Sequence, residues 1–240
     1  VSVDNGLIDG EYDVFRIVPE SQDKVAKLTL GKGLTVVAQK WNAVYIGPKN
    51  KTDIEIFNAI LVTEAMLEAR GTGDAAYATI RGNGTLHGTS ITINGGRIVQ
   101  SSSNPIYHPQ YGELIINDGE IVGGATGVEI RAGRLTINGG TITGNGDPFE
   151  SDPNGNGSTT LGAAVAAVQH TTKLNLTVEI KAGTFNGVRA FYQADLQNNG
   201  AEALAKISIT LWKNAVFNGE VLVDSAQAKI ETDTDTRYYM

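Results

Sequence analysis

The chain has 240 residues, of which 41% are hydrophobic and 19% charged, so it can bury a continuous core and is not a disordered segment. The net charge of −7 leaves no basic stripe for phosphate contacts, which argues against nucleic acid as a partner, and no apolar run is long enough for a membrane span. Cysteine is absent, which excludes disulfides, thiol catalysis and cysteine metal sites. The 29 glycines and 6 prolines fit many tight turns between short strands.

The N-terminal third contains three short segments in which apolar residues alternate with other residues, at 1–8, 28–35 and 54–61. Alternation places the apolar side chains on one face of a strand, so we expect three strands that face a core. The next segment, residues 64–70, is rich in Ala, Leu and Glu. Its composition predicts a short helix at a corner of the fold.

The middle of the chain contains three clear copies of one motif. They read ITINGGRI at 91–98, LIINDGEI at 114–121 and LTINGGTI at 135–142. Two apolar residues at i and i+2 share one face of a strand, and the Asn and Gly residues accommodate a sharp turn before a second inward-facing strand. We expect each copy to pack on the next, with further strands at 127–131 and 164–168.

An aromatic cluster, IYHPQY at 106–111, lies between the first two copies. Aromatic rings with polar edges suit stacking on sugars, so the sequence predicts a ligand site at Tyr107, His108 and Tyr111. The structural alternative is a corner of the fold with partly buried tyrosines.

A polar insertion follows the third copy, at about 144–161. Asp152, Asn154 and Asn156 match the first half of a calcium loop, in which oxygen ligands alternate along the chain. The position of the bidentate glutamate holds Ala163, so the second half of the loop pattern fails. We expect either a calcium site or a polar loop that protrudes from one face.

The C-terminal third contains weaker copies of the motif at 178–185 and 209–216, with an Ala-rich segment between them that predicts a short helix at 201–206. Three carboxylates alternate with threonines over 231–236, which is typical of a solvated edge strand that discourages end-to-end association. We expect residues 229–240 to cap this end of the domain.

The motif copies resemble the coils of the pectate-lyase-like right-handed parallel β-helix family, most clearly over residues 90–143. The resemblance implies an all-β fold in which residues 1–240 form a single right-handed β-helix, or β-solenoid, with coils of about 21 to 27 residues. A β-sandwich is the structural competitor, although it would not explain why the same unit recurs in register.

The resemblance also implies an internal asparagine ladder, with the amides of Asn94, Asn117 and Asn138 hydrogen-bonded from one copy to the next. Arg97 and Glu120 share the next variable position, and we expect a surface ion pair worth at most about 1 kcal/mol.

Family members include polysaccharide lyases and hydrolases, bacterial surface adhesins and phage tail-spike proteins, and architecture alone does not choose between them. The Asn-Thr-Asp, Asp-Asp and Gly-His-Gly segments typical of the hydrolases are absent, and His87-Gly88 is only a fragment of the last. Glu129 and Arg131 share a strand face, but no second carboxylate aligns with them.

We therefore expect a non-catalytic module, displayed outside the cell, on a bacterial surface or on a virion, that binds a glycan or protein receptor. A polysaccharide lyase or glycoside hydrolase with a divergent site is the alternative. Assembly into a homo-oligomer, such as a trimer, or into a larger shell is a further expectation.

Overall fold

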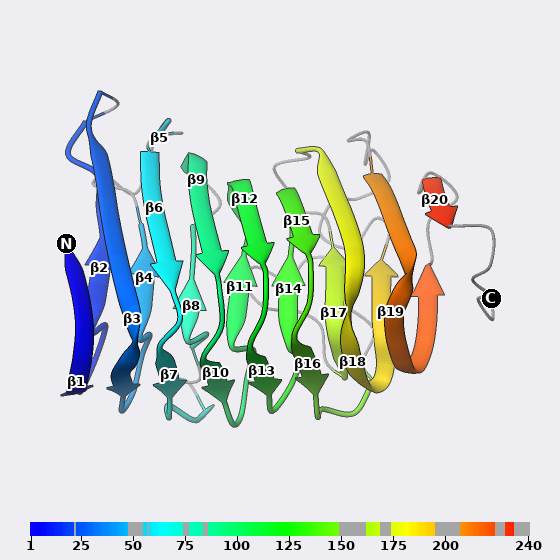
Figure 1. Cartoon of the computed structure of the whole chain (residues 1–240), viewed down its shortest axis with the longest axis horizontal. Coiled ribbons are helices and arrows are strands. Elements are labelled where there is room, and N and C mark those ends of the chain that lie inside the picture. Colours follow the sequence, from blue (N-terminus) through cyan, green and yellow to red (C-terminus); the bar gives the residue numbers. More distant parts are fainter. Residues whose placement is uncertain are drawn as a thin grey trace.

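The computed structural model describes residues 1–21, 23–47, 55–56, 58–73, 77–83, 86–148, 162–168, 174–194, 207–223 and 229–232. Its elements are twenty strands, and every pairing between them is parallel (Figure 1). No helix in this part of the chain is long and apolar enough to cross a membrane.

Most strands belong to one of three ladders of parallel pairs. The first ladder holds β5 (Glu55–Ile56), β6 (Asn58–Thr63), β9 (Leu86–Ile93), β12 (Tyr111–Ile116) and β15 (Gly133–Ile137). The second holds β7 (Met66–Ala69), β10 (Arg97–Gln100), β13 (Glu120–Gly123) and β16 (Thr141–Gly144). The third holds β2 (Phe15–Ile17), β4 (Val44–Ile46), β8 (Ile80–Arg81), β11 (Ile106–His108), β14 (Val128–Ile130) and β17 (Ala163–Val168).

Four longer strands and the short strand β20 join these ladders at the two ends of the molecule. They are β1 (Ser2–Gly10) and β3 (Val25–Ala38) at the N-terminal end, and β18 (Leu176–Ala194), β19 (Ile207–Val223) and β20 (Lys229–Thr232) at the other end. Because β3 pairs with both β6 and β7, and β18 pairs with both β15 and β16, each of the two belongs to the first and the second ladder at once.

These long strands close a ring. The pairings run from β3 through β6, β9, β12 and β15 to β18, and return through β16, β13, β10 and β7 to β3. The result is a closed parallel barrel of 10 strands with extra strands outside the ring, which corrects the expected right-handed β-helix and the solenoid description that went with it. The physical reason lies at the corners, where Lys181, Ala182 and Gly183 keep the pairing of β18 going through the turn, with Gly183 at a φ of +119°, instead of ending the strand.

The copies of the sequence motif nevertheless pair in register within the ladders. Leu114 of β12 lies opposite Ile91 of β9 and Leu135 of β15, and Leu135 lies opposite Val178 of β18. These side chains are fully buried in one apolar cluster that extends from Ile17 to Ala215. Burial of each such side chain contributes about 1.5–3 kcal/mol, so the register follows from the core.

Two helix predictions have different outcomes. Residues 64–70 are not a helix: β7 (Met66–Ala69) pairs with β3 and β10, and Leu67 and Ala69 are buried. Helix propensity is a weak preference, and the two flanking strands override it here. The predicted helix at 201–206 lies outside the described residues, as do residues 233–240 of the expected cap.

Candidate ligand-binding groove

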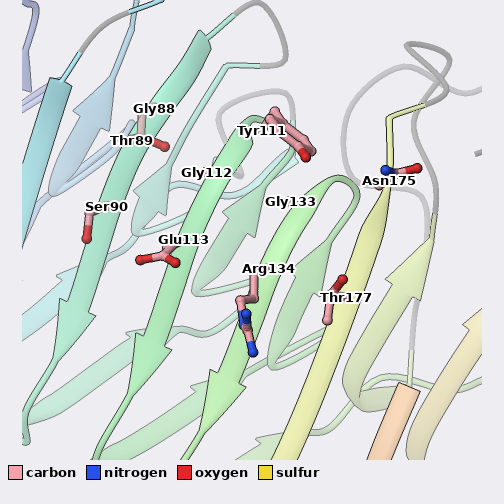
Figure 2. A pocket seen from close by; sticks show the side chains of 10 residues that line it. All are labelled: Gly88, Thr89, Ser90, Tyr111, Gly112, Glu113, Gly133, Arg134, Asn175 and Thr177. Atoms are coloured by element: carbon pink, nitrogen blue, oxygen red, sulfur yellow. The ribbon is translucent and has the colours of Figure 1, made fainter. Parts of the chain in front are cut away.

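An open groove of about 480 Å³ lies on the outer face of the first ladder. Its lining comes from β9, β12, β15 and β18 and from the residue that precedes β18 (Figure 2). The lining residues are Gly88, Thr89, Ser90, Tyr111, Gly112, Glu113, Gly133, Arg134, Asn175 and Thr177.

A row of polar side chains crosses the groove at one register position. Ser90, Glu113, Arg134 and Thr177 are partners in four successive strands. Each immediately precedes the first buried apolar residue of a motif copy, so alternation along the strand turns it outward. Neighbouring strands lie about 4.8 Å apart, and the row therefore offers hydrogen-bonding groups at regular steps.

Small residues form the hollow beside this row. A side chain at Gly112 would meet Thr89 Oγ1 at 2.3 Å, and one at Gly133 would meet the backbone oxygen of Gly112 at 2.2 Å. The strands can approach this closely only because both positions are glycine. The two glycines thus let β9, β12 and β15 lie close together along the groove, because the adjacent strand fills the space that their side chains would take.

Tyr111 supplies the aromatic wall of the groove. Its side chain is 40% exposed, and its ring centroid lies 5.5 Å from that of His87, tilted by 53°. Figure 2 shows the ring at the upper end of β12, where it projects above Gly112. An exposed ring held by a neighbouring ring offers a flat apolar face with a polar hydroxyl edge.

The charged groups of the groove are exposed. Arg134 Nη2 lies 3.6 Å from Glu179 Oε2, and Lys181 Nζ lies at the same distance from that oxygen. Glu113 has no ion-pair partner among the described residues. Pairs this exposed contribute about 0–1 kcal/mol, so Arg134 can exchange its protein partner for a ligand at little cost.

The structure separates the three residues of the predicted ligand site. Tyr111 lines the groove, whereas Tyr107 and His108 lie in β11 of the third ladder, where their exposed fractions are 6% and 0%. Tyr107 Oη accepts a hydrogen bond of 3.2 Å from Arg131 Nη1, and burial raises the pKa of the Tyr107 hydroxyl. Both residues are buried within a strand, so the structure brings neither of them to the groove.

Glu129 and Arg131 form a buried ion pair beside Tyr107. Both side chains are fully buried, and Arg131 Nε lies 3.6 Å from Glu129 Oε1. Asn104 Nδ2 donates a hydrogen bond of 2.8 Å to Glu129 Oε2. The two side chains therefore share a strand face, as expected. Because the pair is buried and does not line the groove, its role is structural. Loss of either partner would leave the other charge buried without compensation, which would destabilise the fold.

The asparagine ladder is confirmed in its hydrogen bonds and corrected in its position. Asn117 Nδ2 donates to Asn94 Oδ1 at 2.8 Å, and Asn138 Nδ2 donates to Asn117 Oδ1 at 2.7 Å. The three side chains are exposed and not internal, because the turn directs them away from the core. The expected surface pair is also present, with Arg97 Nε at 2.8 Å from Glu120 Oε2.

A second ladder of side-chain amides was not predicted from the sequence. Asn218 Nδ2 donates to Asn186 Oδ1 at 2.8 Å, and Asn186 Nδ2 donates to Thr143 Oγ1 at 3.3 Å. The polar row of the groove was missed as well. Its signal was the residue immediately before each motif copy, which is polar or charged in all four cases.

The predicted calcium ligands Asp152, Asn154 and Asn156 lie outside the described residues, so calcium binding stays a prediction. In the part of the chain that is described, no group of three or more His, Asp or Glu side chains could hold a metal ion.

Comparisons with known families, with curated proteins and with solved structures found no match to this chain.

Proposed function

We propose that the protein is a non-catalytic recognition module that binds a glycan in the groove of the first ladder. The observation that carries the proposal is the exposed Tyr111 ring beside a row of polar side chains at regular strand spacing. A sugar ring has an apolar face, which suits the tyrosine, and hydroxyl groups, which suit Ser90, Glu113 and Arg134.

The composition of the groove supports binding over hydrolysis. Glycoside hydrolases place two carboxyl groups about 5–9.5 Å apart across the scissile bond. Among the groove-lining residues that the structure describes, Glu113 is the single carboxylate. The groove is also open to solvent, which suits binding of a glycan chain more than enclosure of a substrate for catalysis.

The proposal is tested by titrating the purified chain with a panel of oligosaccharides in a calorimeter. Truncation of Tyr111 to alanine removes the stacking face, and we expect the Kd to rise by about tenfold or more, equivalent to about 1.4 kcal/mol. Trp212→Ala is the matched control, because Trp212 is an exposed aromatic residue of β19 outside the groove.

Two results would overturn the proposal. One is wild-type affinity in the Tyr111→Ala variant together with weakened binding in the Trp212→Ala control. The other is the appearance of shortened or unsaturated sugar products during the titration, which would favour a lyase or hydrolase.

A further inference from the structure

Three aromatic residues form a column away from the groove, near the N-terminal end. Tyr12, Trp41 and Tyr77 lie in the links that join β1 to β2, β3 to β4 and β7 to β8. These links turn at the lower edge of the molecule in Figure 1. We call this set the aromatic column.

The backbone holds the first two links side by side. Gln39 N donates to Gly10 O at 2.8 Å, and Lys40 N donates to Glu11 O at 2.9 Å. Val44 N donates to Thr79 O at 2.9 Å, which ties the second link to the third. Because β1, β3 and β7 pair in succession, the three rings follow one another at about the spacing of neighbouring strands.

The rings contact each other edge to face. The centroids of Tyr12 and Trp41 are 4.9 Å apart at 69°, and those of Trp41 and Tyr77 are 5.9 Å apart at 67°. These contacts stabilise the corner. Stability alone does not account for the exposure, since Tyr12 and Trp41 remain 47% and 41% exposed.

Charged groups flank the column at both ends. Lys40 Nζ lies 5.2 Å from the centroid of Tyr12 and is paired with Glu11, and Arg81 Cζ lies 4.6 Å from the centroid of Tyr77. These cations would repel a cationic ligand, and because Lys40 and Glu11 neutralise each other, the part of the column around Tyr12 and Trp41 suits an uncharged ligand. Trp41, between them, offers an aromatic face with hydrogen-bonding groups on either side.

We propose that the aromatic column is a second glycan site, which binds a neutral oligosaccharide that extends along the column. The apolar faces of the sugar rings stack on Trp41 and Tyr12, and their hydroxyl groups contact Glu11 and Lys40. The ligand class rests on the proposed function, whereas the site is independent of the groove because the two share no residue.

The site can be observed on its own through tryptophan emission. The chain has two tryptophans, so Trp212→Phe leaves Trp41 as the only one. In this background we would titrate neutral hexasaccharides of glucose, mannose and xylose. A saturable change in Trp41 emission is expected, with an apparent Kd that rises about tenfold or more in Tyr12→Ala and stays unchanged in Tyr111→Ala.

The outcomes separate the two sites. Calorimetric binding that Tyr111→Ala abolishes, without any change in Trp41 emission, overturns the second site and leaves the groove in place. A Trp41 response that disappears in Tyr111→Ala also overturns the second site, because the signal then comes from the groove. If no hexasaccharide produces heat or an emission change, both proposals fail.

Discussion

His108 is an ionisable residue that lies in the core, where a charged side chain is unfavourable. Its side chain is fully buried, and it lies opposite Ile130 of β14 in the third ladder. Burial penalises the charged form and lowers the pKa of His108 to about 4. The folded protein therefore holds a neutral imidazole at pH values where the unfolded chain is protonated.

This depressed pKa predicts a loss of stability in mild acid. Between the unfolded pKa near 6.5 and the folded pKa of about 4, the unfolded state binds more protons, so the free energy of unfolding falls as pH falls through this window. The loss reaches about 3 kcal/mol. Urea denaturation of wild type and His108→Leu from pH 7.5 to 4 measures it, and the variant should show a smaller fall.

His87→Leu is the control for this experiment, since His87 is the partly exposed histidine that contacts Tyr111. An equal pH dependence in wild type and His108→Leu would show that other groups cause the acid sensitivity.

At the residue scale, the hydrogen bonds between the motif asparagines could be predicted from the sequence, whereas the burial of polar side chains could not. The family resemblance implied hydrogen bonds between the three asparagines at one motif position, and these bonds are present, although the side chains lie on the surface and not inside. The burial of Tyr107 and His108 was not predictable, because it depends on neighbouring strands that pack on β11. Tyr111, three residues beyond His108, was predicted with them and is the one that reaches the surface.

The turns between elements depend on glycines that are not equivalent. At the corner between β9 and β10, Gly96 has a φ of +81°, and a side chain there would meet the backbone oxygen of Ala65 at 2.3 Å. The adjacent Gly95 has open space around its Cβ position. Adjacent glycines of the same motif therefore have different roles.

We expect Gly96→Ala to reduce the free energy of unfolding by at least about 1–2 kcal/mol, from the left-handed backbone alone, with a further cost from the clash. Gly95→Ala should change it by less than about 0.5 kcal/mol. Urea unfolding followed by circular dichroism compares the two variants. Similar losses in both would show that this corner is less constrained than the geometry indicates.

At the scale of elements, side-chain alternation in the sequence predicted where strands lie. It did not predict that some strands continue through a corner. The motif copies predicted β9, β12 and β15 closely, since an apolar residue at every second position suits a half-buried strand. The segment 64–70 became β7 because β3 and β10 hydrogen-bond to it on both sides. Such partners are distant in the sequence, so local propensity could not reveal them.

At the scale of the whole molecule, the larger of two apolar clusters in the described residues joins both ends. This cluster includes buried side chains from β2 through β19. A ring of paired strands with a shared core should unfold in one cooperative transition. A chain whose segments contact only their nearest neighbours could instead unfold from one end.

Two single-tryptophan variants test this cooperativity. Trp212→Phe leaves Trp41 near the N-terminal end, and Trp41→Phe leaves Trp212 in β19. We expect each variant, followed in urea by emission and by circular dichroism, to give the same midpoint with both probes. Emission midpoints that depart from the circular dichroism midpoints in opposite directions would contradict a single cooperative unit.

The sequence by itself determined the all-β character, the register of the motif copies and the hydrogen bonds between the motif asparagines, but not that these asparagines lie on the surface. Each of these depends on side-chain alternation and on the turn chemistry of Asn and Gly, which are local properties. Only the tertiary structure decided how the strands close and where the groove lies. Ring closure depends on β3 and β18 continuing through their corners, and the groove depends on residues from four strands meeting at one register position. Both require pairings between distant segments, and a local pattern cannot specify them.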